Sequence, residues 1–244
     1  MLKAALITGA AGFIGSHLTE HCLGLGWRVT AVDAFTDYYD PSAKRRNASS
    51  FADDPRCTLV EADLLELDLA SLLDGISVVF HLAAQPGVRT SWDEFDVYVR
   101  QNVTATQRLL AAAGKAPLER FVVASSSSVY GDAESLPTGE DVVPRPVSPY
   151  GATKVATEQL AHIYWRNFGV PTVTLRYFTV YGPRKRPDMA FNRLIACSLD
   201  GQPFEVFGDG NQTRDFTFVT DAVAGTIAAG IGAEPGMAYN IGGG

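Results

Sequence analysis

The sequence is poor in cysteine and has no long apolar run. Cys22, Cys57 and Cys197 are odd in number and lie far apart among 244 residues, which disfavours a disulfide framework or a zinc site. This cysteine usage favours a reducing compartment, so we expect a cytoplasmic protein with three buried, unreactive thiols. No apolar run reaches the about 18 residues of a membrane-spanning helix, and the N-terminal residues lack a signal-peptide pattern.

Positive charge is also scarce. The chain has 20 Lys and Arg against 27 Asp and Glu, which gives a formal net charge of −7. Binding to nucleic acid needs clustered cations that neutralise phosphates, so we expect no nucleic-acid partner. Hydrophobic residues make up 46% of the chain, which is enough for a packed core and excludes a disordered protein.

Short apolar segments alternate with helix-length segments over most of the chain. We predict strands at residues 4–8, 28–33, 58–61, 76–81, 121–124 and 173–176, and helices at residues 13–25, 102–113 and 149–168. This alternation predicts an α/β fold with a doubly wound parallel sheet. Turn residues become frequent from Tyr177, so we expect one domain over residues 1–176 and a smaller lobe over residues 177–244.

A glycine-rich turn, Gly9-Ala-Ala-Gly12-Phe-Ile-Gly15, follows the first predicted strand and opens a helix. Glycines let the backbone approach a pyrophosphate, which the N–H groups of the helix N-terminus then bind. Asp33 ends the second predicted strand, 18 residues after Gly15. A carboxylate there accepts both ribose hydroxyls and repels a 2′-phosphate. The pattern predicts a Rossmann domain that binds NAD rather than NADP.

Two further strand ends are expected at the cofactor. Asp63 and Leu64 follow the third strand, where a carboxylate could accept from the adenine amino group. Leu82, Ala83 and Ala84 follow the fourth strand and are small enough for a dinucleotide to pass close by. His81 is interpreted as a packed strand residue rather than a catalyst.

Tyr150 and Lys154 stand at positions i and i+4 of a predicted helix, on one face. A free tyrosine has a pKa near ~10, which a neighbouring cation lowers. The phenol can then take the proton of an alcohol while hydride leaves the same carbon. Four hydroxyl side chains, Ser125 to Ser128, follow an apolar strand at the sheet edge where ligands bind in such folds.

The glycine turn, the Ser126-to-Gly131 stretch, Tyr150-x-x-x-Lys154 and the stretch from Thr213 to Asp221 together resemble the extended short-chain dehydrogenases/reductases that act as NAD-dependent nucleotide-sugar epimerases and dehydratases. The resemblance implies bound NAD, a catalytic triad of Ser126, Tyr150 and Lys154, and a homodimer. The cofactor-binding residues that we expect are Gly9, Gly12, Phe13, Ile14, Gly15, Asp33, Asp63, Leu64, Leu82, Ala83, Ala84, Asn102, Ser125, Tyr150, Lys154 and Tyr177.

Residues 177–190 are similar to the UDP-glucuronate 4-epimerases, whereas UDP-galactose 4-epimerases typically carry Asn at the position of Thr179. Residues 176–193 hold five cations and one acid. Such a cluster suits an anionic substrate, although a solvated basic loop would look the same. The substrate-binding residues that we expect are Arg89, Ser127, Ser128, Thr179, Arg186, Arg193, Phe207 and Arg214.

The resemblance implies reversible C4 epimerisation of UDP-glucuronate to UDP-galacturonate through a 4-keto intermediate. UDP-glucose/UDP-galactose 4-epimerisation remains an alternative. Decarboxylases and 4,6-dehydratases typically place an acid where Ser127 or Ser128 stands, and a non-catalytic NAD-sensing regulator would not need the intact triad. Members of the family usually continue beyond the position of Gly244, so we expect the lobe to be truncated at its C-terminal end.

Overall fold

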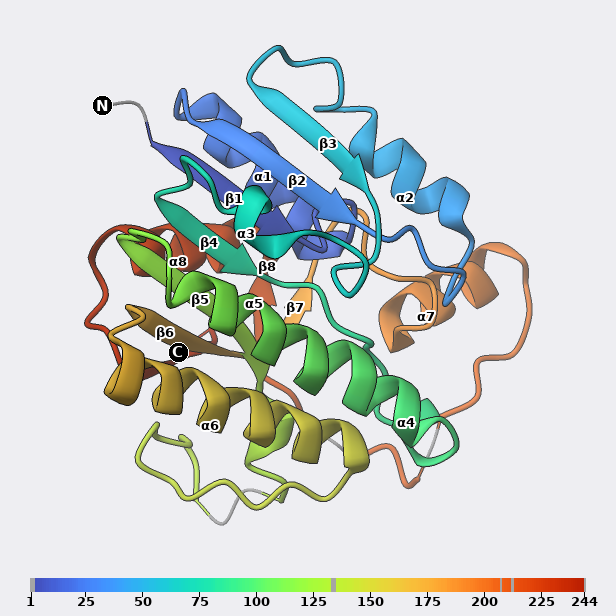
Figure 1. Cartoon of the computed structure of the whole chain (residues 1–244). Coiled ribbons are helices and arrows are strands. Elements are labelled where there is room, and N and C mark those ends of the chain that lie inside the picture. Colours follow the sequence, from blue (N-terminus) through green and yellow to red (C-terminus); the bar gives the residue numbers. More distant parts are fainter. Residues whose placement is uncertain (1–2, 133–134, 207, 212, 244) are drawn as a thin grey trace.

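The computed structural model describes residues 3–132, 135–206, 208–211 and 213–243 (Figure 1). Its centre is a seven-stranded parallel sheet in the order β3-β2-β1-β4-β5-β6-β9. The strands are β1 (Ala4–Thr8), β2 (Arg28–Asp33), β3 (Cys57–Glu61), β4 (Val78–His81), β5 (Arg120–Ser126), β6 (Thr172–Tyr177) and β9 (Ala238–Ile241). The order 3-2-1-4-5-6 is that of doubly wound dinucleotide-binding folds, which confirms the predicted fold class.

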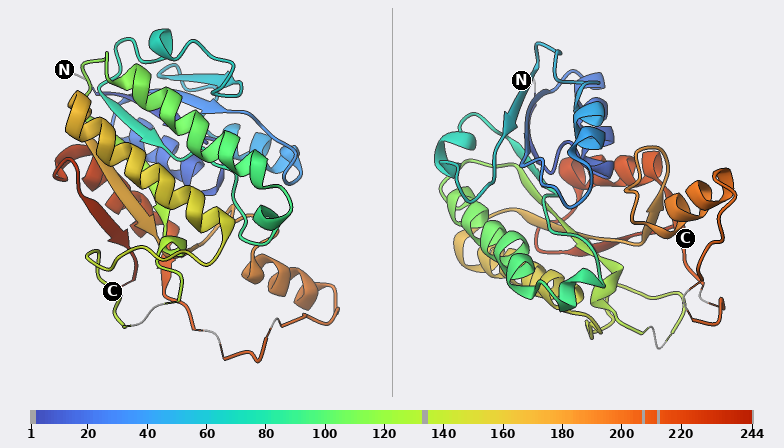
Figure 2. Two further views of the ribbon diagram at one scale, coloured as in Figure 1. Left: turned by 60° about the horizontal axis from the view of Figure 1, so that its bottom comes forward. Right: turned by 90° about the vertical axis from the view of Figure 1, so that its right-hand side faces the viewer.

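Helices cover both faces of this sheet (Figure 2). Alternate residues of a strand point to opposite faces, so Ala5 and Ile7 join one apolar cluster while Ala4 and Leu6 join the other. The first cluster is closed by α1 (Phe13–Gly24), α2 (Pro41–Ala48) and α8 (Val219–Gly232). The second is closed by α3 (Leu69–Leu72), α5 (Ala105–Ala113) and α6 (Pro149–Phe168).

The helix predicted at residues 102–113 begins earlier than expected. Helix α4 (Phe95–Tyr98) and a π-helical segment (Val99–Thr104) lead directly into α5, and a 3₁₀ turn (Thr90–Trp92) precedes them. Single π-helical turns inside longer helices often lie near functional sites. The segment runs past the carboxyl edge of the sheet, where the cavity described below lies.

The chain after Tyr177 contributes some elements to a small lobe and others to the central sandwich. A small parallel pair, β7 (Thr179–Tyr181) with β8 (Phe216–Phe218), and α7 (Ala190–Leu199) stand apart from the sheet (Figure 2). Helix α8 and strand β9 return to the sandwich, because α8 packs on the core and β9 pairs with β6. Part of the chain beyond residue 177 thus belongs to the sandwich.

Three smaller expectations can be compared with the structure. Cys22 is buried as predicted, but Cys57 and Cys197 are only partly buried, and all three thiols are free. His81 is buried and its ring bonds the Thr8 and Thr106 hydroxyls at 2.8 and 2.9 Å. Burial lowers the pKa of His81 to about 3, which confirms a packed, neutral histidine. Within the described ranges, no helix is both long and apolar enough to cross a membrane.

Candidate active site

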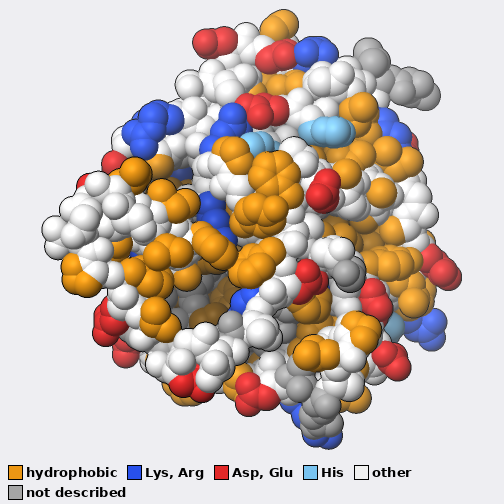
Figure 3. Space-filling view, turned by 180° about the vertical axis from the view of Figure 1, so that it is seen from behind, with side chains coloured by type: hydrophobic (Ala, Val, Ile, Leu, Met, Phe, Trp, Pro, Cys, Tyr) orange, Lys and Arg blue, Asp and Glu red, His pale blue; other side chains and the backbone are white. Residues whose placement is uncertain are grey.

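A cavity of about 810 Å³ lies at the carboxyl ends of the strands, between the sheet and a lobe that contributes residues between 178 and 190 together with Arg214. Figure 3 shows the surface hollowed beside this lobe, with hydrophobic and Lys or Arg side chains around the hollow. The predicted residues that line the cavity are Gly9, Gly12, Phe13, Ile14, Gly15, Asp33, Asp63, Leu64, Leu82, Ala83, Ala84, Arg89, Ser125, Ser126, Ser127, Ser128, Tyr150, Lys154, Tyr177, Thr179, Arg186 and Arg214. One cavity thus joins three groups of residues that sequence patterns had selected separately.

The glycine turn has no room for side chains. Gly9 has φ +69, and a Cβ there would lie 2.9 Å from the amide nitrogen of Ala83. A Cβ on Gly15 would clash with the carbonyl oxygen of Gly9. Helix α1 starts after Gly12 without a side-chain cap, so the first N–H groups of the helix are left for an anion. This cradle fits the pyrophosphate of a dinucleotide.

Asp33 is buried at the end of β2, and its carboxylate is already well bonded. It accepts from the amide nitrogens of Ala11 at 3.1 Å and Phe35 at 2.8 Å. Lys44 of α2 donates to the same carboxylate at 2.8 Å and also lines the cavity. The sequence analysis missed Lys44, because no local pattern brings a helix residue to a strand end.

Asp63 is also fixed in place. Its Oδ1 accepts from the amide nitrogen of Leu65 and its Oδ2 from Gln101, both at 2.9 Å. Asn102 does not line the cavity. Its side chain instead bonds both the amide nitrogen and the carbonyl oxygen of Gln85 and the Thr153 hydroxyl, so it holds the loop after β4 from behind.

Helix α6 positions Tyr150 and Lys154. Ser148 caps the helix by accepting from the amide nitrogen of Gly151 at 3.1 Å, and Pro149 occupies the first turn, as helix N-termini favour. Tyr150 therefore lies in the first turn, with Lys154 one turn further on. The Lys154 ammonium donates to the carbonyl oxygen of Ala124 at 2.8 Å and lies 5.9 Å from the centre of the Tyr150 ring.

The pKa of Tyr150 is raised, and not lowered as the sequence analysis expected. Burial is the main cause, and the charge of Arg186 and a hydrogen bond with Ser126 oppose it. Burial also lowers the pKa of Lys154 to about 8, against the charge of Glu158. The charge of Arg186 therefore acts on the phenol, in addition to the Lys154 ammonium over its ring.

A buried ion pair lies next to Tyr150 and Lys154 on helix α6 and strand β6. Glu158, two turns after Tyr150, accepts from Arg176 of β6 at 3.0 and 2.8 Å. It also accepts from the Ser125 hydroxyl at 2.5 Å. Arg176 continues to the Tyr130 hydroxyl at 2.8 Å. Sequence reasoning missed Glu158, although its i+8 spacing from Tyr150 places it on the same helix face.

The lobe contributes the remaining predicted residues. Arg186 lines the cavity, whereas Arg184 pairs with Glu20 of α1 at 2.7 Å and Lys185 lies over the Phe191 ring. Arg193 is not in the cavity lining and stacks on the ring of Phe204. Phe207 lies outside the residues that the structure describes.

Comparisons with known proteins agree with this geometry. Residues 5–242 match the model of the "NAD dependent epimerase/dehydratase family". An uncharacterised UDP-glucose epimerase of Bacillus subtilis is 48% identical over 98% of this chain and 76% of its own length. The UDP-glucuronate 4-epimerase of Thermodesulfobacterium geofontis is 40% identical over 92% of this chain and 70% of its own.

A solved structure is similar over nearly the whole chain. The UDP-glucuronic acid 4-epimerase of Bacillus cereus, in complex with UDP-glucuronic acid and NAD, superposes with a TM-score of 0.96 at 47% identity. The match covers 99% of this chain and 78% of that one. The likeness includes every element that lines the cavity.

Proposed function

Because the chain belongs to the NAD dependent epimerase/dehydratase family, we propose that it interconverts UDP-glucuronate and UDP-galacturonate by epimerisation at C4. The observation that carries the proposal is a single cavity. The glycine turn and Asp33, the Ser126, Tyr150 and Lys154 cluster, and Thr179 with Arg186 all line it. The Bacillus cereus complex with UDP-glucuronic acid and NAD supports the choice of sugar.

NAD is the cofactor that these residues fit. The turn from Gly9 to Gly15 would hold the pyrophosphate, and Asp33 the adenosine ribose. When bound, NAD would supply a hydride acceptor and donor for C4 and a positive ring close to the phenol. Cofactor released from the denatured protein is expected to be NAD rather than NADP.

Tyr150 accepts and returns the proton of the C4 hydroxyl. Burial raises the pKa of this phenol, and the charge of Arg186 and the bond with Ser126 oppose that rise. A cation close to the phenol favours the phenolate, which is the form that accepts the sugar proton. Ser126, bonded to Tyr150, donates to the same sugar oxygen and fixes its position. Lys154, anchored on the Ala124 carbonyl oxygen, keeps positive charge beneath the phenol ring.

The carboxylate of the sugar needs separate control. Once C4 is a ketone, the C6 carboxylate is β to it. The C5–C6 bond can then break, CO₂ leaves, and the electron pair passes through C5 to the C4 oxygen before C5 is protonated. Thr179 and Arg186, with Ser127 and Ser128, would hold the carboxylate out of line with the carbonyl. Arg suits this task because its planar fork matches a carboxylate.

UDP-glucose is the second candidate substrate, since the Bacillus subtilis relative is described as a UDP-glucose epimerase. The purified protein is to be assayed with UDP-glucuronate and with UDP-glucose, and the products separated by chromatography. We expect UDP-galacturonate from the first and much slower turnover of the second. Comparable or faster turnover of UDP-glucose would contradict the proposed substrate.

Tyr150→Phe tests the chemistry in the same assay. The variant keeps the ring but lacks the proton acceptor, so turnover should fall by about 10²–10⁴-fold, the usual size of general-base catalysis. Bound NAD should be retained. Activity within a few-fold of the unmodified enzyme would show that another group accepts the proton.

The proposal includes a homodimer in the cytoplasm. Exposed apolar side chains lie on the helices that cover one face of the sheet, among them Ile163 and Phe168 of α6 and Phe95 of α4. Such a face suits an isologous contact between two copies. Light scattering at micromolar concentration tests this assembly, and a monomer mass would contradict it. The three free cysteines suit a reducing compartment.

A further inference from the structure

Arg186 is held along one edge by Asp188. The Asp188 carboxylate accepts from Nε and Nη2 of Arg186, each at 3.0 Å. Two parallel bonds fix the plane and the direction of a guanidinium, which a single contact does not. Among the described residues, Nη1 of Arg186 has no hydrogen-bond partner. That end of the side chain remains available to a ligand in the cavity that Arg186 lines.

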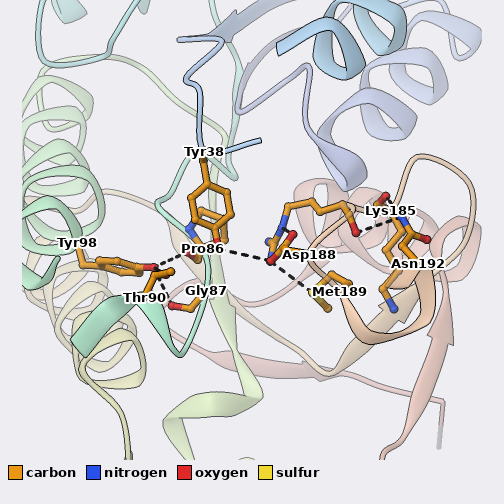
Figure 4. A network of polar contacts seen from close by, with 10 residues as sticks. Tyr38, Pro86, Gly87, Thr90, Tyr98, Lys185, Asp188, Met189 and Asn192 are labelled. Carbon is orange, nitrogen blue, oxygen red and sulfur yellow. Dashed lines mark hydrogen bonds and ion pairs between the residues drawn. The ribbon is translucent and has the colours of Figure 1, made fainter. Parts of the chain in front are cut away.

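Asp188 is in turn tied to the opposite side of the cavity. Tyr38, in the loop after β2, donates from its hydroxyl to Asp188 Oδ2 over a long 3.4 Å, and its ring lies 5.8 Å from the Arg186 guanidinium carbon. Figure 4 shows Tyr38 reaching from the sandwich toward Asp188 and Met189 of the lobe. The loop that carries Arg186 is thus held in place by contacts with the sandwich as well as by contacts within its own lobe.

Neighbouring residues fix the position of the Tyr38 hydroxyl. Its hydroxyl bonds Thr90, and a Cβ on Gly87 would clash with it. Tyr98 bonds the Thr90 hydroxyl at 2.5 Å and packs edge-on against Tyr150, with ring centres 6.2 Å apart. A continuous series of contacts therefore runs around the cavity from Tyr150 to Asp188.

We propose that Asp188 is a positioning residue that sets the angle at which Arg186 holds the sugar carboxylate. The inference rests on the proposed function, because it concerns the same carboxylate. Asp188 has two opposing effects on the reaction. Its charge partly neutralises Arg186 and so weakens the attraction for an anionic substrate, while its two oxygens give Arg186 the orientation that keeps C6 out of line with the C4 ketone.

These two effects predict that loss of the Asp188 charge changes kcat and KM in different ways. Asp188→Asn keeps the size of the side chain and an acceptor for Tyr38, but removes the charge and one of the two acceptors for Arg186. We expect KM for UDP-glucuronate to stay the same or fall. We expect kcat to fall about tenfold or more, since small misplacements at a reacting centre have effects of this size. The share of decarboxylated UDP-4-keto-pentose among the products should rise.

The controls make the outcome decisive. Asp200→Asn removes the same charge from an exposed residue of the lobe outside the cavity lining and should behave like the unmodified enzyme. Tyr38→Phe removes the hydroxyl that bonds Asp188 and Thr90 but leaves both bonds between Asp188 and Arg186, so it should raise the pentose share by a smaller factor. This variant decides the question if Asp188→Asn fails to fold.

A KM that rises, or a kcat and product ratio equal to those of Asp200→Asn, would overturn the role of Asp188. The proposed function is judged separately, on the unmodified enzyme in the same assay. If that enzyme does not epimerise UDP-glucuronate, the proposed function fails. If it does and Asp188→Asn matches it, only the positioning role fails.

Discussion

Two arginine–carboxylate pairs flank the cavity, and they differ in burial. Arg176 and Glu158 join β6 to α6, with side chains only 7% and 6% exposed. Arg186 and Asp188 lie two residues apart in one loop of the lobe, with side chains 22% and 37% exposed. A buried pair is costly to break because one charge is left without a partner or water, whereas an exposed pair contributes little to stability. The same chemistry can therefore support the fold in one place and adjust a substrate site in another.

The buried pair also holds or influences several groups around it. Glu158 holds the Ser125 hydroxyl at the cofactor side of the cavity, and Arg176 holds the Tyr130 hydroxyl. The charge of Glu158 also raises the pKa of Lys154 against the burial that brings it to about 8. Regular elements and buried bonds thus fix the side of the cavity that Ser125 and Lys154 line.

The largest expected effect is the loss of the buried pair. Glu158→Gln leaves Arg176 without its counter-charge, so the free energy of unfolding should fall by about 3–5 kcal/mol. Denaturant unfolding measures this change. Glu61→Gln is a matched control, because it breaks the solvent-exposed pair with Arg45 and should leave stability nearly unchanged. Equal effects of the two variants would refute the contrast in burial.

Glu158→Gln also has a predicted effect on the pH profile. Lys154 is charged below its pKa of about 8 and neutral above it. Without Glu158 that pKa falls, so the ammonium is lost at lower pH than before. The alkaline limit of activity should move to lower pH in the variant, provided that it is measured at a temperature where the variant remains folded. A limit that does not move would mean that Lys154 charge does not govern it.

Six of the seven strands of the sandwich could be predicted from the sequence because they are short, mostly apolar runs, whereas β9 and the helices α2, α3 and α8 were not predicted. Strand β1, strand β2 and helix α6 occur where the pattern placed them, and the glycine turn with Asp33 follows from local spacing. Elements β7, β8 and α7 were not predicted, because they are short or expose most of their surface. Their conformation depends on contacts from distant parts of the chain.

The residues of the candidate site also fall into those that the sequence could predict and those that it could not. Tyr150 and Lys154 can be recognised by their spacing within one helix. Arg186, which was expected at the site, lines the cavity, whereas Arg184 and Lys185 do not. Asp188 could not be recognised beforehand as its partner. Its setting depends on Tyr38, which lies 150 residues earlier. Three-dimensional proximity of this kind leaves no periodic trace in a sequence.

Replacement of Arg186, the cation of the exposed pair, is expected to have an intermediate effect on substrate binding. Arg186→Ala should weaken UDP-glucuronate binding by about 1.5–3 kcal/mol, the range for hydrogen bonds to charged groups, or release decarboxylated product. Arg184→Ala is the matched control, since it removes the same charge two residues away, where the side chain pairs with Glu20 outside the cavity. Titration with UDP-glucuronate and product analysis compare the two. If both variants bind and react alike, the positive charge of the segment acts only at long range.

The smallest expected effect is on the stability of Asp188→Asn. Arg186 and Asp188 are reached by water and lie two residues apart in the sequence, so their pair resembles the surface pairs that contribute about 0–1 kcal/mol. The free energy of unfolding should therefore stay within about 1 kcal/mol of the unmodified protein, even though the reaction is altered. Denaturant unfolding beside Glu158→Gln makes the comparison direct. A loss as large as that of the buried pair would mean that Asp188 supports the lobe as a whole, and any kinetic change would then follow from a loosened fold. A small loss together with altered products would instead show that this exposed pair serves the orientation of Arg186 and hardly the fold.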